Sequence, residues 1–245
     1  MMFSWNDRTR QWMEDASAWT GYCKNLARLL LDHIPVRGSL CDMGCGLGLV
    51  DFELAPSIGE ITCVDVADYA VESVRARAER LGVNNITAVK GDGLETEGRW
   101  DTILALFHGS SDRICRKYLS MANDRLIFVT HGGGWGHTGP GGVRIPRCSS
   151  VAKDSAWLDG QGVVYTLVTG ELEFGQPHRS FEDAVAYHRE FNRKAPEDEL
   201  IPYVRKAVRE TGRDDFPLYT PKKRDFGMFV IRRGDNGAYL SRSDR

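Results

Sequence analysis

Short apolar runs alternate with amphipathic stretches along the first half of the chain. The runs are flanked by turn residues, which is typical of buried strands. The stretches between them repeat apolar positions at spacings of three and four, which predicts helices. We therefore expect strands at 39–43, 60–66, 86–90, 101–107 and 125–130, and helices at 49–54, 67–81 and about 111–121.

The two ends of the chain follow other patterns. The first 35 residues predict a short helix followed by a second helix, which Pro35 and Gly38 end. A glycine-rich run at 132–142 interrupts the alternation. Beyond it we expect a strand region at 163–174, a helix capped by Ser180, a helix at 197–211, a last strand at 226–232 and a frayed polar tail.

Strands that alternate with helices favour a parallel sheet with right-handed crossovers. The 245 residues suit one or two domains. We expect one α/β domain over 1–245, with a helical cap at 1–35, a ligand-binding core at 36–131 and an acceptor-side part at 132–245.

Composition narrows the function classes. The chain has 32 Lys and Arg against 34 Asp and Glu, a net charge of −2, which gives no global reason to bind nucleic acid or an anionic membrane. Residues 203–245 are locally basic, with 11 Lys/Arg and 6 Asp/Glu. No segment resembles a signal peptide or a membrane span, and the six cysteines lack metal-binding spacing. We expect a cytoplasmic protein with reduced thiols and no metal.

Residues that could bind a ligand follow the ends of the first three predicted strands. Asp42-Met43-Gly44-Cys45-Gly46-Leu47-Gly48 follows the first, and its glycines let a ligand approach the backbone at a helix N-terminus. Asp65 ends the second, where a carboxylate can accept ribose hydroxyl bonds or cap a helix. Asp92, in Gly-Asp-Gly after the third, offers a carboxylate acceptor or forms an ordinary turn.

The order acid-x-Gly-x-Gly-x-Gly resembles motif I of the class I S-adenosylmethionine (SAM) dependent methyltransferases, and the resemblance covers about residues 36–131. The dinucleotide fingerprint would need a glycine where Leu49 stands. The resemblance implies a doubly wound, mostly parallel seven-stranded Rossmann-like sheet with an antiparallel final hairpin, N-terminal helices and a helical insertion before the last strand. It also implies SAM as donor and S-adenosylhomocysteine (SAH) as product. The cofactor-binding residues would be Asp42, Gly44, Cys45, Gly46, Gly48, Asp65, Val66, Asp92, Gly93, Leu106 and Phe107.

The acceptor side carries fewer signals. The fourth strand ends at Phe107-His108-Gly109, without the Asn/Asp-Pro-Pro-aromatic signature of nitrogen-methylating relatives. His108 and His131 follow the fourth and fifth strands and are candidate general bases. Trp135, in the glycine-rich run, and Tyr22 are candidate contacts for the acceptor.

These features predict a SAM-dependent methyltransferase that acts on a small molecule by in-line displacement. We expect no nucleic-acid partner and no membrane, and leave a homo-oligomer open. The alternatives are a protein or RNA methyltransferase and, less favoured, an NAD-dependent oxidoreductase or a non-catalytic SAM-binding protein. The glycine spacing and Asp92 count against the nicotinamide alternative.

Overall fold

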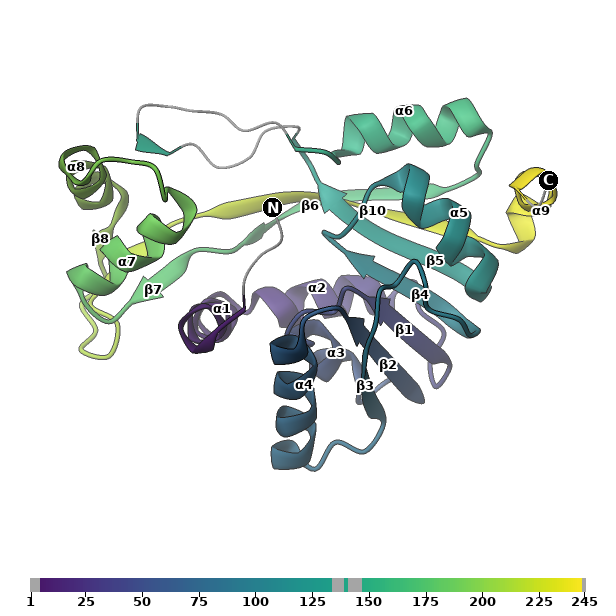
Figure 1. The fold of residues 1–245 in the computed structure, drawn as a ribbon, viewed down its shortest axis with the longest axis horizontal. Helices are drawn as coiled ribbons and strands as arrows, with labels where there is room; N and C mark the ends of the chain where they lie inside the picture. Colours follow the sequence, from purple (N-terminus) through teal and green to yellow (C-terminus); the bar gives the residue numbers. More distant parts are fainter. Residues whose placement is uncertain (1–4, 134–138, 141–146, 244–245) are drawn as a thin grey trace.

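A seven-stranded sheet forms the centre of the protein (Figure 1). The computed structural model describes residues 5–133, 139–140 and 147–243. The strand order β3-β2-β1-β4-β5-β10-β6 runs outward from β1 in both directions, so the expected doubly wound fold is confirmed. The parallel strands are β1 (Ser39–Met43), β2 (Glu60–Asp65), β3 (Ile86–Lys90), β4 (Trp100–Leu106) and β5 (Ala122–His131). The antiparallel end consists of β10 (Lys223–Arg232) between β5 and β6 (Thr166–Glu173).

Helices cover both faces of this sheet, because successive strand side chains point to opposite sides. Leu40, Leu104 and Met228 pack on the face covered by α2 (Tyr22–Leu31), α3 (Leu49–Leu54) and α4 (Asp68–Leu81). Cys41 and Phe229 pack on the other face. That face is covered by α5 (Ser111–Met121), α6 (Val151–Gln161) and α9 (Gly237–Ser243).

The first helix, α1 (Asp7–Thr20), contacts a part of the chain that is distant in sequence, near Asp183. Asn6 begins it with a capping box, and Gly21 ends it with a φ of 66°. The indole nitrogen of Trp12 donates to Asp183 at 2.8 Å. Trp12 is therefore a buried contact of this helix rather than a lining residue of the cavities described below.

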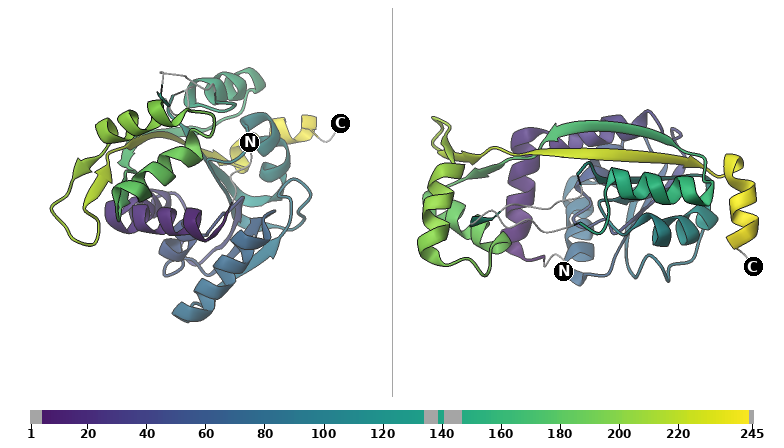
Figure 2. Two further views of the ribbon diagram at one scale, coloured as in Figure 1. Left: turned by 60° about the vertical axis from the view of Figure 1, so that its left-hand side comes forward. Right: turned by 90° about the horizontal axis from the view of Figure 1, so that it is seen from above.

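An insertion separates β6 from β10 (Figures 1 and 2). It has its own small core and a three-stranded sheet of order β7-β9-β8. In the antiparallel register Phe226 pairs with His131, so residues 223–225 of β10 continue past the end of β5 toward the insertion. Figure 2 shows β10 as one long strand that connects the insertion to the C-terminal helix. The elements of the insertion are β7 (Gln176–His178), α7 (Phe181–Phe191), α8 (Glu197–Ala207), β8 (Arg209–Glu210) and β9 (Leu218–Thr220).

Several elements differ from the sequence prediction. Helix α6 and strands β7, β8 and β9 were not expected. The predicted helix at 197–211 ends at Ala207, and the tail forms the turn η2 (Gly234–Asn236) and helix α9 instead of fraying. Within the described ranges, no helix is long and apolar enough to cross a membrane.

Candidate active site

The turn after β1 depends on glycine. Gly44, Gly46 and Gly48 have φ angles of 77°, 56° and 63°, in the left-handed region that side chains disfavour. A Cβ on Gly44 would come within 2.7 Å of the His108 ring, so this glycine also permits a close approach. The backbone N–H of Gly44 donates to the Val64 carbonyl at 2.8 Å, which fixes the turn against β2.

Asp65 ties the glycine turn to the next helix. One carboxylate oxygen accepts from the Gly46 N–H at 2.9 Å, and the other accepts from the Ala67 N–H at 2.9 Å. Asp65 therefore caps the next helix, as one of the two interpretations expected. The two hydrogen bonds hold its carboxylate at the edge of the sheet where a ribose would bind. Val66, the next residue, is 41% exposed at the same edge.

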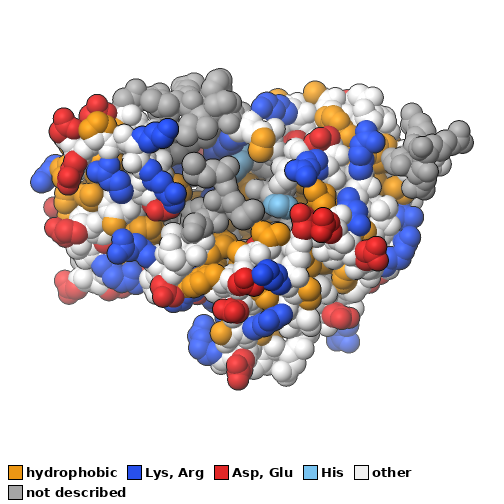
Figure 3. Space-filling model, viewed as in Figure 1, with side chains coloured by type: hydrophobic (Ala, Val, Ile, Leu, Met, Phe, Trp, Pro, Cys, Tyr) orange, Lys and Arg blue, Asp and Glu red, His pale blue; other side chains and the backbone are white. Residues whose placement is uncertain are grey.

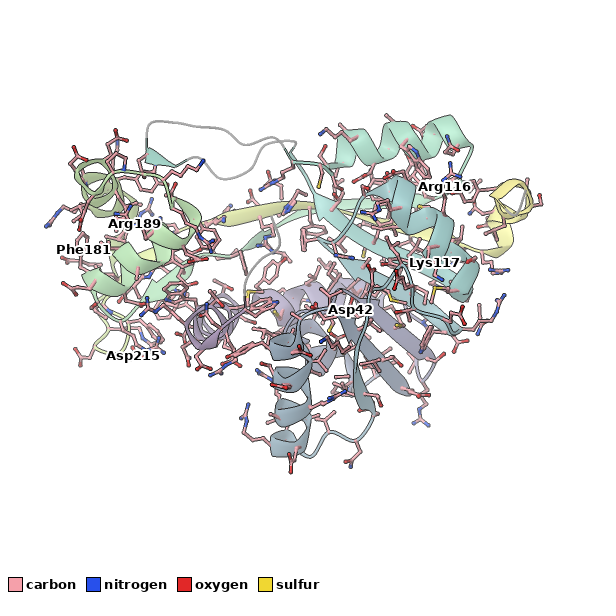
Figure 4. All side chains as sticks on the ribbon, viewed as in Figure 1. Asp42, Arg116, Lys117, Phe181, Arg189 and Asp215 are labelled. Carbon is pink, nitrogen blue, oxygen red and sulfur yellow. The ribbon has the colours of Figure 1, made fainter. Side chains whose placement is uncertain are left out.

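Two carboxyl groups are buried beneath this turn. Asp42, at the end of β1, is 1% exposed, and Asp51, in the first turn of α3, is 0% exposed. Burial, followed by the charge of Asp51, raises the pKa of Asp42 well above its ordinary value. Burial raises the pKa of Asp51 to about 7, so the pair retains a proton at neutral pH. Within the described part of the chain, Oδ1 of Asp42 has no hydrogen-bond partner. Figure 4 shows Asp42 in the middle of the molecule.

The third sequence signal lies nearer the surface. Asp92 is exposed, and its carboxylate accepts from the Leu94 N–H at 2.9 Å, as in an ordinary turn. Gly93 lies against the hydroxyl of the buried Tyr118, with no room for a side chain. Burial, with the nearby charge of Asp92, raises the pKa of Tyr118 to about 12, so this phenol stays protonated at neutral pH.

Phe107, just past β4, has a φ of 54°, which is uncommon for a residue with a side chain. Its N–H donates to the Val129 carbonyl at 2.7 Å, and its ring lies 5.0 Å from that of His131. Such a conformation costs about 1–3 kcal/mol and persists only where its surroundings impose it. Phe107 therefore marks the end of β4 as a site under constraint.

Two cavities meet at Phe107. The first, of about 160 Å³, contains the glycine turn, and the second, of about 240 Å³, contains both candidate bases. Figure 3 shows histidine side chains in the hollow middle of this face. The predicted residues that line the first cavity are Tyr22, Asp42, Gly44, Cys45, Gly46, Leu106 and Phe107. Those that line the second are Phe107, His108 and His131.

The two histidines differ in their electrostatic surroundings. Burial lowers the pKa of His108, while Asp65 and Asp92 act in the opposite direction. Burial lowers the pKa of His131 to about 3, with further lowering by Arg147, Arg224 and Lys222. Both imidazoles are therefore neutral at pH 7, and His131 is the weaker base.

Arginines at these cavities were not singled out by the sequence. Arg224 lines the first cavity and packs its guanidinium on Phe174, Phe107 and Tyr22, at 3.7, 4.8 and 5.2 Å from the ring centres. Arg147 lines the second cavity. In the sequence, the excess of basic residues over 203–245 was the feature that could have pointed to Arg224. Trp135, a predicted acceptor contact, and His137 lie outside the described residues.

Part of the chain matches a known protein family. Residues 24–126 match the family model of the methyltransferase small domain. That range holds the glycine turn, Asp65, Asp92 and strands β1 to β4. This part of the chain is similar to the class I SAM-dependent methyltransferases. The resemblance inferred from the motif order is confirmed.

Individual methyltransferases show the extent of the similarity. Ribosomal RNA small subunit methyltransferase C of Shewanella halifaxensis (strain HAW-EB4) is 30% identical over 112 residues, which are 43% of this chain and 33% of that protein. The chain thus matches about a third of the length of this curated relative.

Two solved structures share the fold. PH1948 from Pyrococcus horikoshii, a proposed RNA methyltransferase, has a TM-score of 0.51 at 14% identity, covering 89% of this chain and 83% of that chain. Magnesium protoporphyrin IX methyltransferase (ChlM) from Synechocystis PCC 6803, with bound SAM, has a TM-score of 0.51 at 15% identity, covering 94% and 86%.

These comparisons correct one expectation. The predicted small-molecule acceptor, with no nucleic-acid partner, is wrong, because the curated relative methylates ribosomal RNA and PH1948 is a proposed RNA methyltransferase. The prediction rested on a net charge of −2, which averages over the whole surface. Arg147 and Arg224 show that positive charge is concentrated at the cavities themselves.

Proposed function

We propose that this protein transfers a methyl group from SAM to RNA. The donor supplies an electrophilic methyl group on a sulfonium sulfur. The chain has to hold that donor, admit one acceptor atom in line with the methyl group and exclude water. The observation that carries the proposal is the cavity in which the glycine turn, a buried Asp42 oxygen and Phe107 meet.

The first cavity fits the amino-acid end of the donor. Its wall at Gly44 and Gly46 is backbone without side chains. Oδ1 of Asp42 is buried on that wall and, among the described residues, has no partner. A buried acceptor without a partner costs about 1–3 kcal/mol, which a donated bond from an ammonium group would offset. We therefore assign the ammonium end of the donor to Asp42.

The nucleoside end would lie along the neighbouring strand ends. Asp65 is held by two backbone donors and keeps lone pairs for ribose hydroxyls. The exposed carboxylate of Asp92 can accept from the adenine amino group. Val66 offers an apolar surface at the same edge.

The second cavity would receive the acceptor nucleotide. His108 lies against Gly44 and lines this cavity, so one residue borders both the donor turn and the acceptor space. Its neutral imidazole can take a proton from an acceptor that loses one on methylation. His131 is less suited to this role, because three nearby cations oppose its protonation.

Methyl-labelled SAM tests the function. The purified chain is incubated with an unmodified small-subunit ribosomal RNA transcript, with a protein extract and with a metabolite extract. We expect label only in the RNA, and nuclease digestion should release it. Label confined to another fraction would overturn the RNA proposal. Calorimetry with SAH separates the two halves of the proposal, since binding without any transfer would indicate a non-catalytic SAM-binding protein.

A further inference from the structure

Three cations converge between the insertion and the second cavity. Lys222 immediately precedes β10, and Arg224 is its second residue. Arg147 approaches from the segment that follows β5 and donates to the Gly133 carbonyl at 3.1 Å. Arg147 lines the second cavity together with His131, and Arg224 packs on Phe107, whose ring lies 5.0 Å from that of His131. All three cations lower the pKa of His131.

These cations lack a matching set of carboxylates. Burial lowers the pKa of Lys222 to about 8, and Arg224 and Arg147 lower it further. Asp225 acts on Arg147. The Lys222 carbonyl accepts from the Phe174 N–H at 2.7 Å, but within the described part of the chain no hydrogen bond or ion pair holds its ammonium group. Its neighbour Lys223 differs, because it is exposed and pairs with Glu171 at 2.5 Å. The fold therefore holds like charges together, and a bound anion would offset their repulsion.

An aromatic cavity opens beside Lys222. It has a volume of about 210 Å³ and lies between α7, α8 and the segment before β10. Tyr187, Phe191 and Tyr203 supply its aromatic surface, while Lys222 supplies its charge. Phe191 is 44% exposed, which is unusual for a large apolar side chain and leaves ring surface for a ligand.

Aromatic side chains beside a cation form a surface that suits a nucleotide. Bases stack on aromatic rings irrespective of sequence, and phosphates bind Lys and Arg. We propose that Lys222, flanked by Arg224 and Arg147, binds a backbone phosphate of the RNA, and that a neighbouring base stacks in the cavity of Tyr187, Phe191 and Tyr203. This assignment rests on the proposed function, and it places the flanking nucleotide on the insertion while the methylated one enters the second cavity.

Binding of a fluorescein-labelled single-stranded RNA of about 12 nucleotides, followed by anisotropy, tests this site. Lys222→Met should weaken binding roughly tenfold or more, since it removes a charge-assisted contact. Phe191→Ala, at a partly exposed position, should weaken binding by about tenfold through lost stacking. Lys223→Met is the matched control, because it removes the same charge from the adjacent exposed position, and it should bind like the wild type.

Two further measurements separate this inference from the proposed function. All variants should bind SAH normally, and a loss in Lys222→Met would mean that the cations serve the donor, which overturns the inference. Equal RNA binding by Lys222→Met and wild type would also overturn it, while the proposed function stands. If the wild type binds no RNA, the function fails. In that case, thermal stabilisation of the wild type by inorganic pyrophosphate that disappears in Lys222→Met would still support the anion site. If pyrophosphate does not stabilise the wild type, the anion site fails together with the proposed function.

Discussion

Asp42 and Asp51 form a pair whose protonation links stability to pH. Asp51 ionises near 3.8 in the unfolded chain but at about 7 in the folded protein. Between these values the folded state binds more protons than the unfolded state. Because the folded pKa is raised, the contribution to the free energy of unfolding is present at low pH and is lost as the pH rises toward 7.

Asp51→Asn cannot ionise and should remove this dependence. We expect the variant to gain stability relative to the wild type between about pH 5 and about pH 8, where the wild-type carboxyl loses its proton at a cost. Urea unfolding of both proteins at the two pH values measures the change. Parallel pH profiles would show that Asp51 is ionised in the folded protein throughout.

His108 and His131 give a second prediction at this scale. His108→Gln should lower turnover by roughly 10²–10⁴ if the acceptor must lose a proton, and His131→Gln should lower it far less. Since burial lowers the pKa of His108, the acidic limb of the wild-type rate profile should lie below 6.5 and disappear in His108→Gln. SAH affinity should change little in either variant. Full turnover in His108→Gln would show that His108 is not a general base and that the positioning of donor and acceptor accounts for the rate.

At the scale of elements, the glycine turn after β1 combines a backbone requirement with a close approach. Gly46 has a φ of 56°, and a Cβ there would lie 3.0 Å from the Trp5 ring. Gly82, which ends α4 at a φ of 63°, has open space around it. The two positions therefore share the conformational cost of a side chain, about 1–2 kcal/mol, but only Gly46 faces a cavity.

Gly46→Ala and Gly82→Ala separate these effects. Both should lower the free energy of unfolding by about 1–2 kcal/mol, as left-handed alanines do. Only Gly46→Ala should also weaken SAH binding, because its methyl group enters the first cavity. Calorimetry and urea unfolding provide the two readouts. Equal SAH affinities in the two variants would remove the turn from the donor site.

Elements with strong local patterns were predictable from the sequence, and weakly patterned ones were not. Strands β1 and β3 have the predicted bounds, because buried strands bounded by turn residues carry their own signal. Helix α6 buries only Asp154 and Leu158, so its sequence lacks an apolar stripe. Strands β7, β8 and β9 have two or three residues each, too few to show a period, and they form only by pairing with distant segments.

The candidate site shows the same division. The glycine turn, Asp65 and Asp92 follow strands in sequence, so their common edge could be inferred from the fold class. Lys222, Arg224 and Arg147 reach the cavities only through the pairing of β10 with β5 and through the path of the chain after β5. Their convergence is a tertiary property and has no local pattern.

For the molecule as a whole, a net charge of −2 together with a local basic cluster predicts a shallow dependence of RNA binding on salt. On a single strand, one phosphate contact gives a slope of about −0.7 for log K against log salt concentration, and one contact for each of the three cations gives about −2. Anisotropy titrations over a range of salt concentrations measure this slope. A slope steeper than about −5 would reveal an extended basic face elsewhere and argue against a local cluster.

The length of β10 has a consequence for how this protein tolerates change. From Arg224 to Val230, alternate residues face the cavity side and then the core on the same side of the sheet. A substitution in the strand alters the contacts of one side chain. Deletion of Asp225 would instead reverse the side of the strand on which each preceding residue lies. Arg224 would then face away from the cavity, or the apolar residues of the strand would leave the core. Variation in this strand should therefore occur by substitution at constant length.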